Sequence, residues 1–215
     1  MKLILVRHGE TEHNRGQLTL GRADVPLNDR GRAQAAALAG SFARAPAAVY
    51  ASPLARCVET ARAVAGAFGL DVITDDGLIE MDVGEMEHLT SGELRERYPE
   101  FLRAWLSPQV AEARMPGGET LAEVQVRAWA AAERMRERHP EGEVVAVAHN
   151  FVILALLCRA LNLPLAEFRR LRTALAAKSV LDVREVGATL LQLNENAYLA
   201  AAGLADDLTG REARP

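Results

Sequence analysis

Short apolar runs along this chain alternate with longer stretches in which apolar residues recur every three or four positions. The runs at 2–6 and 144–148 are almost entirely Val, Leu, Ile and Ala, which is typical of strands buried on both faces. Shorter runs at 48–51 and 71–74 predict a further strand and an edge strand. Because these runs alternate with helical patterns, the chain is predicted to fold as βαβ units around a parallel sheet.

Capping residues mark where the first long helices begin. Asn28 precedes an Ala-rich segment that predicts a helix over 29–44. Ser52 is predicted to cap the next helix, with Pro53 at its first position. That helix is expected to run to about Phe68.

Later helices begin at capping boxes, in which a threonine is followed three positions later by a glutamate. Thr90 begins one such helix, and Thr120 begins a long amphipathic helix that runs through His139. Another helix is expected over 151–162. The last predicted elements are the two strands of a hairpin, at 178–184 and 189–194.

No repeat, linker or shift in composition divides the sequence, so we expect a single domain over residues 1–200. Its predicted fold is an α/β three-layer sandwich, with a mostly parallel sheet and helices on both faces. Residues 80–118 have the weakest periodicity and are expected to form a lid-like insertion over the carboxyl edge of the sheet. Residues 201–215 are expected to be a frayed C-terminal tail.

The composition argues against several classes of protein. Hydrophobic residues make up 49% of the 215 positions and charged residues 25%, which is ordinary for a globular protein. A net charge of −4 without a basic block argues against a nucleic-acid partner, and no apolar stretch is long enough to span a membrane. Arg7 and His8 end the first apolar run too early for a signal peptide. With Cys57 and Cys158 too few for a disulfide framework, a reduced cytoplasmic protein is expected.

Chemically reactive residues follow the two most apolar strands. Arg7 and His8 stand at the end of the first strand, and His149 follows the strand at 144–148. Parallel strands that end side by side would bring both imidazoles to one crevice at the carboxyl edge of the sheet. Arg56 lies in the first turn of a helix, where free backbone N–H groups favour anions. These donors predict a pocket for a phosphate dianion.

With these positions in place, the sequence resembles the histidine phosphatase superfamily, also called the phosphoglycerate mutase-like family. The resemblance spans nearly the whole chain and implies the phosphoglycerate mutase-like fold. The matching stretches, in the family's order, are LVRHGETEHN at 5–14, GRADVPLNDRGRAQA at 21–35, SPLARCVETA at 52–61, LIEMDVGEMEHLT at 78–90, PGGET at 116–120 and VVAVAH at 144–149.

The resemblance implies a role for each candidate residue. His8 would attack phosphorus and become phosphohistidine, while Arg7, Arg56 and His149 would hold the phosphoryl oxygens. Glu80 would protonate the leaving oxygen as general acid, with its pKa raised by burial and lowered by the arginines. The further residues expected to bind phosphate or substrate are Asn14, Gly21 and Asn150.

Three positions depart from the family's pattern. His88 stands where glycine is usual, Asn150 stands where glycine commonly follows the histidine, and Leu20 replaces a common polar residue. Because asparagine tolerates left-handed backbone, the turn after the histidine is expected to survive. We expect these changes to affect the choice of substrate more than the chemistry.

The expected activity is that of a phosphoric monoester hydrolase of the histidine acid phosphatase type, acting on a small-molecule phosphate ester. No cofactor or metal is expected, because no His or Cys spacing matches a zinc site. A homodimer is compatible with the resemblance. Two alternatives remain: a cofactor-dependent phosphoglycerate mutase, for which the segment between Glu80 and Pro116 is short and rather acidic, and a non-catalytic phospho-ligand-binding domain.

Overall fold

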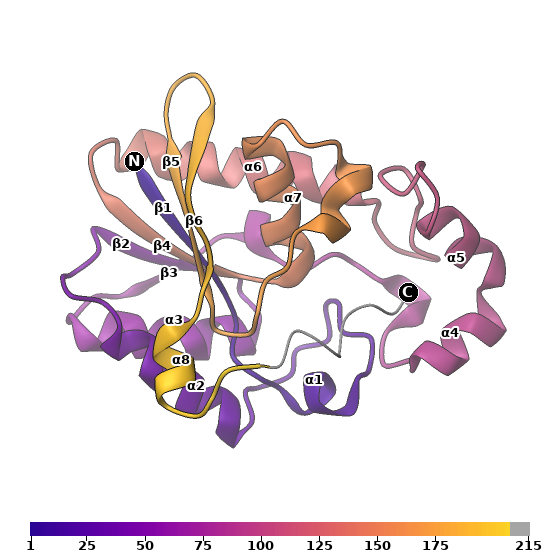
Figure 1. The fold of residues 1–215 in the computed structure, drawn as a ribbon, viewed down its shortest axis with the longest axis horizontal. Coiled ribbons are helices and arrows are strands. Elements are labelled where there is room, and N and C mark those ends of the chain that lie inside the picture. Colours follow the sequence, from indigo (N-terminus) through magenta and orange to yellow (C-terminus); the bar gives the residue numbers. More distant parts are fainter. Residues whose placement is uncertain (207–215) are drawn as a thin grey trace.

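A six-stranded sheet forms the centre of the molecule, as a computed structural model describes it for residues 1–206 (Figure 1). Its strand order is β3-β2-β4-β1-β5-β6. The first four strands are parallel to one another, β5 is antiparallel to β1, and β6 is antiparallel to β5. The predicted mostly parallel sheet is therefore confirmed. The strands are β1 (Lys2–Arg7), β2 (Ala48–Ala51), β3 (Val72–Thr74), β4 (Glu143–Ala148), β5 (Lys178–Val183) and β6 (Ala188–Glu195).

Helices cover both faces of this sheet, as predicted. Figure 1 shows α2 and α3 on one side of the strands and α6 and α7 on the other. Shorter helices complete the chain, with 3-10 turns at Asp76–Leu78, Gly84–Met86 and Leu165–Arg170. The helices are α1 (Glu12–Gly16), α2 (Asp29–Gly40), α3 (Ala55–Ala67), α4 (Ser91–Arg97), α5 (Pro99–Trp105), α6 (Leu121–Arg138), α7 (Asn150–Ala160) and α8 (Ala197–Ala201).

The central strand β1 is buried on both faces because its residues alternate between two cores. Leu3 and Leu5 pack into the core beneath α6 and α7, whereas Ile4 and Val6 pack into the core beneath α2 and α3. Burying both faces explains why this strand is an unbroken apolar run rather than an alternating one. β1 pairs in parallel with β4, so Arg7 lies opposite Ala148 and the residues after both strands leave the sheet together.

Three predicted helix boundaries were wrong, and one of them is the end of α7, which lies at Ala160 rather than at residue 162. α2 ends at Gly40 rather than at residue 44, because the Ser41 hydroxyl and the Ser41 backbone N–H both donate hydrogen bonds to the Leu38 carbonyl oxygen. α3 begins at Ala55, and Ser52 does not cap it. Ser52 instead continues the sheet, since its N–H donates to the carbonyl oxygen of Val147 at 2.9 Å.

The predicted lid segment, 80–118, contains α4 and α5, which lie together at the right-hand side of Figure 1. Thr90 and Thr120 form the predicted capping boxes at the start of α4 and α6. Trp105, at the end of α5, packs edge-on against the ring of Phe151 and at a tilt against that of Phe168, with centroid distances of 5.7 and 5.8 Å. Aromatic contacts therefore connect this segment to α7.

Residues near the end of the described chain bond back to the body of the protein. The carbonyl oxygens of Leu204 and Ala205 accept from the side chains of Gln34 and Arg30, each at 3.1 Å. The rest of the predicted tail, 207–215, lies outside the described residues. Within residues 1–206, no helix combines the length and apolarity needed to cross a membrane.

Candidate active site

His8 follows β1 directly and is only 3% exposed. Its Nδ1 lies 2.7 Å from the carbonyl oxygen of Gly9. A carbonyl oxygen can only accept, so Nδ1 carries the proton and Nε2 keeps its lone pair. Burial lowers the pKa of His8 well below its ordinary value, and the charges of Arg56 and Arg7 lower it further. His8 is therefore a neutral imidazole with an unprotonated Nε2, the form that can act as a nucleophile.

Two glycines allow the loop after His8 to pack directly on the start of α2. A Cβ on Gly9 would lie 2.6 Å from the Gly31 carbonyl oxygen, and a Cβ on Gly31 would lie 2.1 Å from that of Glu10. Neither distance leaves room for a side chain. The Glu10 carboxylate is buried here and accepts from the Asn28 side chain at 2.8 Å, so it stabilises the loop rather than facing a ligand.

His149 lies beside His8, as predicted from the two strand ends, and Arg56 from the first turn of α3 meets them there. Arg56 is fully buried, and its Nε donates to Nδ1 of His149 at 3.3 Å. Its two terminal nitrogens donate to the carbonyl oxygens of Ala23 at 2.8 Å and Gly21 at 2.7 Å. The ring centroids of His8 and His149 are 5.2 Å apart. Two imidazoles and a guanidinium thus share one buried site.

The far side of His149 contacts residues that the sequence did not reveal. Because Nδ1 accepts from Arg56, the proton of the neutral ring is on Nε2, which donates to the Ser52 hydroxyl at 2.8 Å. The Cys57 thiol lies 3.3 Å from the same nitrogen. Burial and the charge of Arg56 hold the pKa of His149 well below its ordinary value. In the sequence only the SPL stretch points to Ser52, and there it predicts a helix cap rather than a contact with His149.

Glu80 is 4% exposed and is held by backbone donors. One carboxylate oxygen accepts from the Met81 N–H at 2.8 Å and the other from the Phe151 N–H at 3.4 Å. Burial raises the pKa of Glu80, and this effect outweighs the Met81 hydrogen bond and the charges of Arg56 and Arg127, which lower it. A carboxyl with a raised pKa is suited to donate a proton.

Arg7 and Asn150 are connected through Thr173. Nη1 of Arg7 donates to the Thr173 carbonyl oxygen at 2.6 Å, and the Thr173 hydroxyl donates to the Asn150 side-chain oxygen at 3.0 Å. Asn150 is the first residue of α7, so the left-handed turn expected there is absent. His88 is the residue that takes that conformation, with φ of 66°. Of the two replaced family glycines, only His88 therefore carries the backbone cost.

Asn14 and Gly21 bond within the protein around the site. The Asn14 side-chain oxygen accepts from the backbone and hydroxyl of Thr11, both at 3.0 Å, in a capping box at the start of α1. Gly21 presents its carbonyl to Arg56, and its N–H donates to Glu87 at 2.7 Å. Gly21 therefore adjoins Arg56, and the predicted contacts of both residues with phosphate stay predictions.

Glu87 is a structural residue of the site that sequence reasoning missed. Its carboxylate accepts from the backbone N–H groups of Gly21, Arg22 and Ala23, at 2.7, 2.9 and 3.1 Å. The carbonyls of the same loop bind Arg56. Glu87 therefore orients the loop that orients Arg56. The signal lay in the matching stretch at 78–90, where Glu87 follows Gly84 by three positions, but only the folded chain shows which backbone groups the carboxylate meets.

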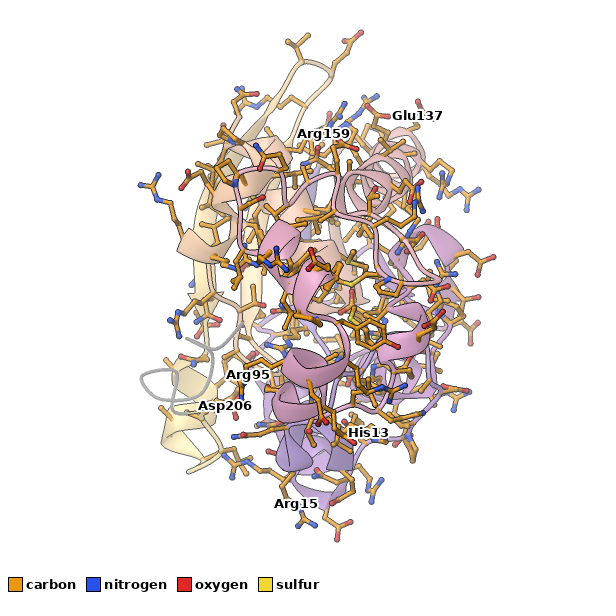
Figure 2. All side chains as sticks on the ribbon, turned by 90° about the vertical axis from the view of Figure 1, so that its right-hand side faces the viewer. His13, Arg15, Arg95, Glu137, Arg159 and Asp206 are labelled. Carbon is orange, nitrogen blue, oxygen red and sulfur yellow. The ribbon has the colours of Figure 1, made fainter. Side chains whose placement is uncertain are left out.

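A pair of histidines lies at the rim of this region. Nε2 of His13 is 2.8 Å from Nδ1 of His88, and His13 is on the face shown in Figure 2. Burial, and then the charge of His88, lower the pKa of His13. Among residues 1–206, no three His, Cys, Asp or Glu side chains gather as a metal site.

Comparison with known proteins gives a consistent result. Residues 3–196 match the model of the histidine phosphatase superfamily, branch 1. Phosphoserine phosphatase 1 of Hydrogenobacter thermophilus is 36% identical over 200 residues, 93% of this chain and 94% of that protein. A probable phosphoglycerate mutase, GpmB, of Enterobacter sp. is 33% identical over 187 residues, 86% of each. The solved α-ribazole phosphatase of Shigella flexneri is 30% identical with a TM-score of 0.82, covering 91% of this chain and 96% of that one.

Proposed function

The chain belongs to the histidine phosphatase superfamily, and on that basis we propose that it is a phosphomonoesterase acting on small-molecule phosphate esters through a phosphohistidine on His8. One observation carries the proposal. The Nδ1–H of His8 donates to the Gly9 carbonyl at 2.7 Å, which leaves a lone pair on Nε2 beside two arginines. The named phosphatases among the similar proteins support the same reaction class.

In the first half of the proposed reaction, Nε2 of His8 attacks phosphorus. The bond from phosphorus to the ester oxygen breaks, and that oxygen takes a proton from Glu80, so a neutral alcohol leaves. The phosphoryl group remains on His8. The charges of Arg7 and Arg56 balance the negative charge on its oxygens.

In the second half, a water molecule attacks phosphorus and the Glu80 carboxylate takes a proton from it. The phosphorus–nitrogen bond breaks, its electron pair returns to Nε2 of His8, and inorganic phosphate leaves. Glu80 thus acts as acid and then as base. Its raised pKa favours the first role, and its hydrogen bonds to Met81 and Phe151 support the carboxylate needed in the second.

Phosphoglycerate mutase is the second candidate, and the similarity to GpmB favours it. Mutase and phosphatase share the same catalytic residues, so the geometry of His8 serves both. The distinction depends on whether water reaches the phosphohistidine before a second substrate oxygen does. The segment between Glu80 and Pro116 carries more acidic than basic residues, which is poorly suited to holding a bisphosphate and supports the phosphatase.

One experiment tests this choice. The purified protein is incubated with 3-phosphoglycerate and a trace of 2,3-bisphosphoglycerate, and separately with a panel of cellular phosphate esters. We expect inorganic phosphate to form from at least one ester, faster than 2-phosphoglycerate forms. Isomerisation faster than phosphate release would identify a mutase, and binding without either product would identify a non-catalytic domain.

Four further expectations belong to the proposal. A cytoplasmic location is supported by the free thiols of Cys57 and Cys158. The histidine acid phosphatase type of activity, metal independence and a homodimer also stay predictions.

A further inference from the structure

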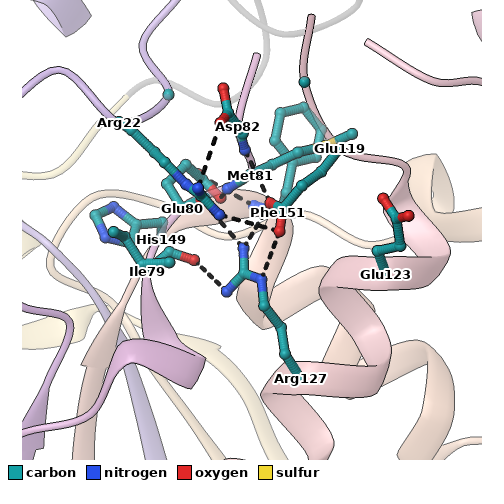
Figure 3. Close-up of polar contacts among 12 residues, drawn as sticks. Arg22, Ile79, Glu80, Met81, Asp82, Glu119, Glu123, Arg127, His149 and Phe151 are labelled. Carbon is teal, nitrogen blue, oxygen red and sulfur yellow. Dashed lines mark hydrogen bonds and ion pairs between the residues drawn. The ribbon is translucent and has the colours of Figure 1, made fainter. Parts of the chain in front are cut away.

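One arginine, Arg127 on α6, holds the chain segment that leads to Glu80 (Figure 3). Its Nη1 donates to the carbonyl oxygens of Gly77 at 3.1 Å and Ile79 at 2.6 Å, and its Nη2 donates to that of Glu80 at 3.1 Å. This segment follows a 3-10 turn and belongs to no strand, so no sheet ladder fixes it. Arg127 supplies the hydrogen bonds that a neighbouring strand would otherwise provide.

Glu119 completes the arrangement from the other side of Glu80. Its carboxylate forms a bidentate ion pair with Arg127, accepting from Nε at 3.1 Å and from Nη2 at 3.0 Å. The same carboxylate accepts from the Asp82 N–H at 3.0 Å. The pair therefore binds carbonyls before Glu80 and an amide after it, and the segment is fixed at both ends.

Arg22 links this pair to the loop that holds Arg56. Its side chain, drawn in Figure 3, lies 3.4 Å from the Glu80 carbonyl oxygen and forms ion pairs with Asp82 at 3.3 Å and Glu119 at 3.0 Å. The backbone N–H of Arg22 is one of the donors to Glu87. The support of the acid and the support of the phosphate-binding arginine are therefore one connected network.

We propose that Arg127 and Glu119 are positioning residues for Glu80: their ion pair fixes the backbone on both sides of it, so that its carboxyl meets the leaving oxygen. This inference rests on the proposed function, in which Glu80 is the general acid. Among the described residues, the Glu80 carboxylate accepts hydrogen bonds from the backbone N–H groups of Met81 and Phe151, so its position follows the backbone. A displacement of about 1 Å in a catalytic group costs on the order of 10²-fold in rate.

The expected signature is selective for the leaving group. Arg127→Gln should lower kcat/KM, which reports the steps up to ester cleavage, on an alkyl phosphate such as glycerol 2-phosphate by roughly 10- to 100-fold, because that alkoxide needs a proton. The same variant should lower kcat/KM on p-nitrophenyl phosphate by less than about threefold, because that leaving group hardly needs one. Glu119→Gln should act in the same direction. Arg127→Lys should recover part of the loss, since it keeps the charge but not the planar fork.

Arg134 provides a matched control on the same helix. Its guanidinium pairs with the carboxylate of Asp75 at 2.7 and 3.0 Å, and Asp75 caps the 3-10 turn before Glu80 through the Gly77 N–H. Arg134→Gln thus removes an arginine–carboxylate pair next to the same segment without removing a bond to residues 79–82. We expect it to leave the ratio of the two kcat/KM values unchanged.

Glu80→Gln serves as the benchmark, and the melting temperature of every variant is recorded. The inference is supported if Arg127→Gln and Glu119→Gln both lose kcat/KM mainly on the alkyl ester, as Glu80→Gln does. Equal losses on both esters, or no loss on the alkyl ester, overturn it. If Arg127→Gln does not fold, Glu119→Gln and Arg127→Lys decide by the same criterion. If Glu80→Gln itself is unselective, or the wild type releases no phosphate, the proposed function fails instead.

Discussion

The Nε–H of Arg56 donates to Nδ1 of His149 across 3.3 Å, and the second histidine of the site is therefore neutral in the folded protein. Burial and the nearby guanidinium charges lower the pKa of both His149 and His8, so His8 is neutral as well. The folded protein thus holds two uncharged imidazoles that the unfolded chain would protonate in mild acid.

The first prediction concerns stability in acid. Both histidines have a pKa well below 6.5 when folded, whereas an unfolded histidine has its ordinary pKa. Below that value the unfolded state binds more protons, so the free energy of unfolding falls as the pH falls. Urea unfolding at about pH 7 and about pH 5 should show this loss, with a smaller loss in His8→Gln. Glu80, whose pKa is raised, opposes the trend equally in both proteins. Identical losses in the two proteins would contradict the prediction.

The second prediction is that His8 carries the phosphoryl group. His8→Ala should lower turnover by a factor of about 10³ or more, because its partners act as a unit with it. Acid-labile phosphohistidine should be trapped on the wild type after a rapid quench and be absent from the variant. Retained activity without a phosphoenzyme would reject the assignment.

The third prediction assigns proton donation to Glu80 rather than to its acidic neighbours Asp82, Glu85 or Glu87. Glu80→Gln should lower kcat/KM, which reports the steps up to ester cleavage, by about 10² to 10⁴ on alkyl phosphates, with a much smaller effect on p-nitrophenyl phosphate. Steady-state kinetics on both esters provides the measurement. A uniform loss would indicate a structural role for this carboxyl.

The fourth prediction tests the loop beneath Arg56. Glu87→Gln replaces a carboxylate that accepts three backbone N–H groups by an amide with one acceptor oxygen. We expect kcat/KM to fall by about tenfold and the free energy of unfolding to fall by about 1–2 kcal/mol. Glu85→Gln is the control, since Glu85 is exposed and its carboxylate accepts from the Tyr98 hydroxyl at 3.1 Å rather than from the loop at 21–23. Similar losses in both variants would refute a specific role for Glu87.

The fifth prediction is that catalysis requires no metal ion. The guanidinium groups of Arg7 and Arg56 supply the positive charge that a metal would bring to a phosphoryl group. Activity should survive prolonged treatment with EDTA and dialysis. Loss of activity that Mg²⁺ or Zn²⁺ restores would overturn this prediction.

The sequence predicted the parts of this structure that depend on local pattern and on strand ends. The buried runs that became β1 and β4 are adjacent and parallel, which is why His8 and His149 meet. Arg56 joins them because α3 begins just beyond β2. These relationships follow from one topological rule, that the carboxyl ends of parallel strands share an edge.

The parts that escaped prediction depend on contacts between distant segments. Serine is a residue type typical of helix caps, but the N–H of Ser52 bonds to the Val147 carbonyl in the sheet, which places its hydroxyl beside His149. Glu87 and Arg127 bind backbone groups dozens of residues away, and no spacing indicates which carboxylate or guanidinium will meet which backbone group. Tertiary packing decided these positions, not local preference.

The close contact between Gly9 and Gly31 limits how this sequence can vary. Gly31 has no part in the chemistry, yet a single methyl group there would strike the backbone of Glu10, two residues after the nucleophile. In a library of all single substitutions screened for phosphate release, position 31 should tolerate as few residues as position 8 does. Mutational constraint in this protein is therefore expected at glycines in backbone contact near the site as well as at the reactive side chains.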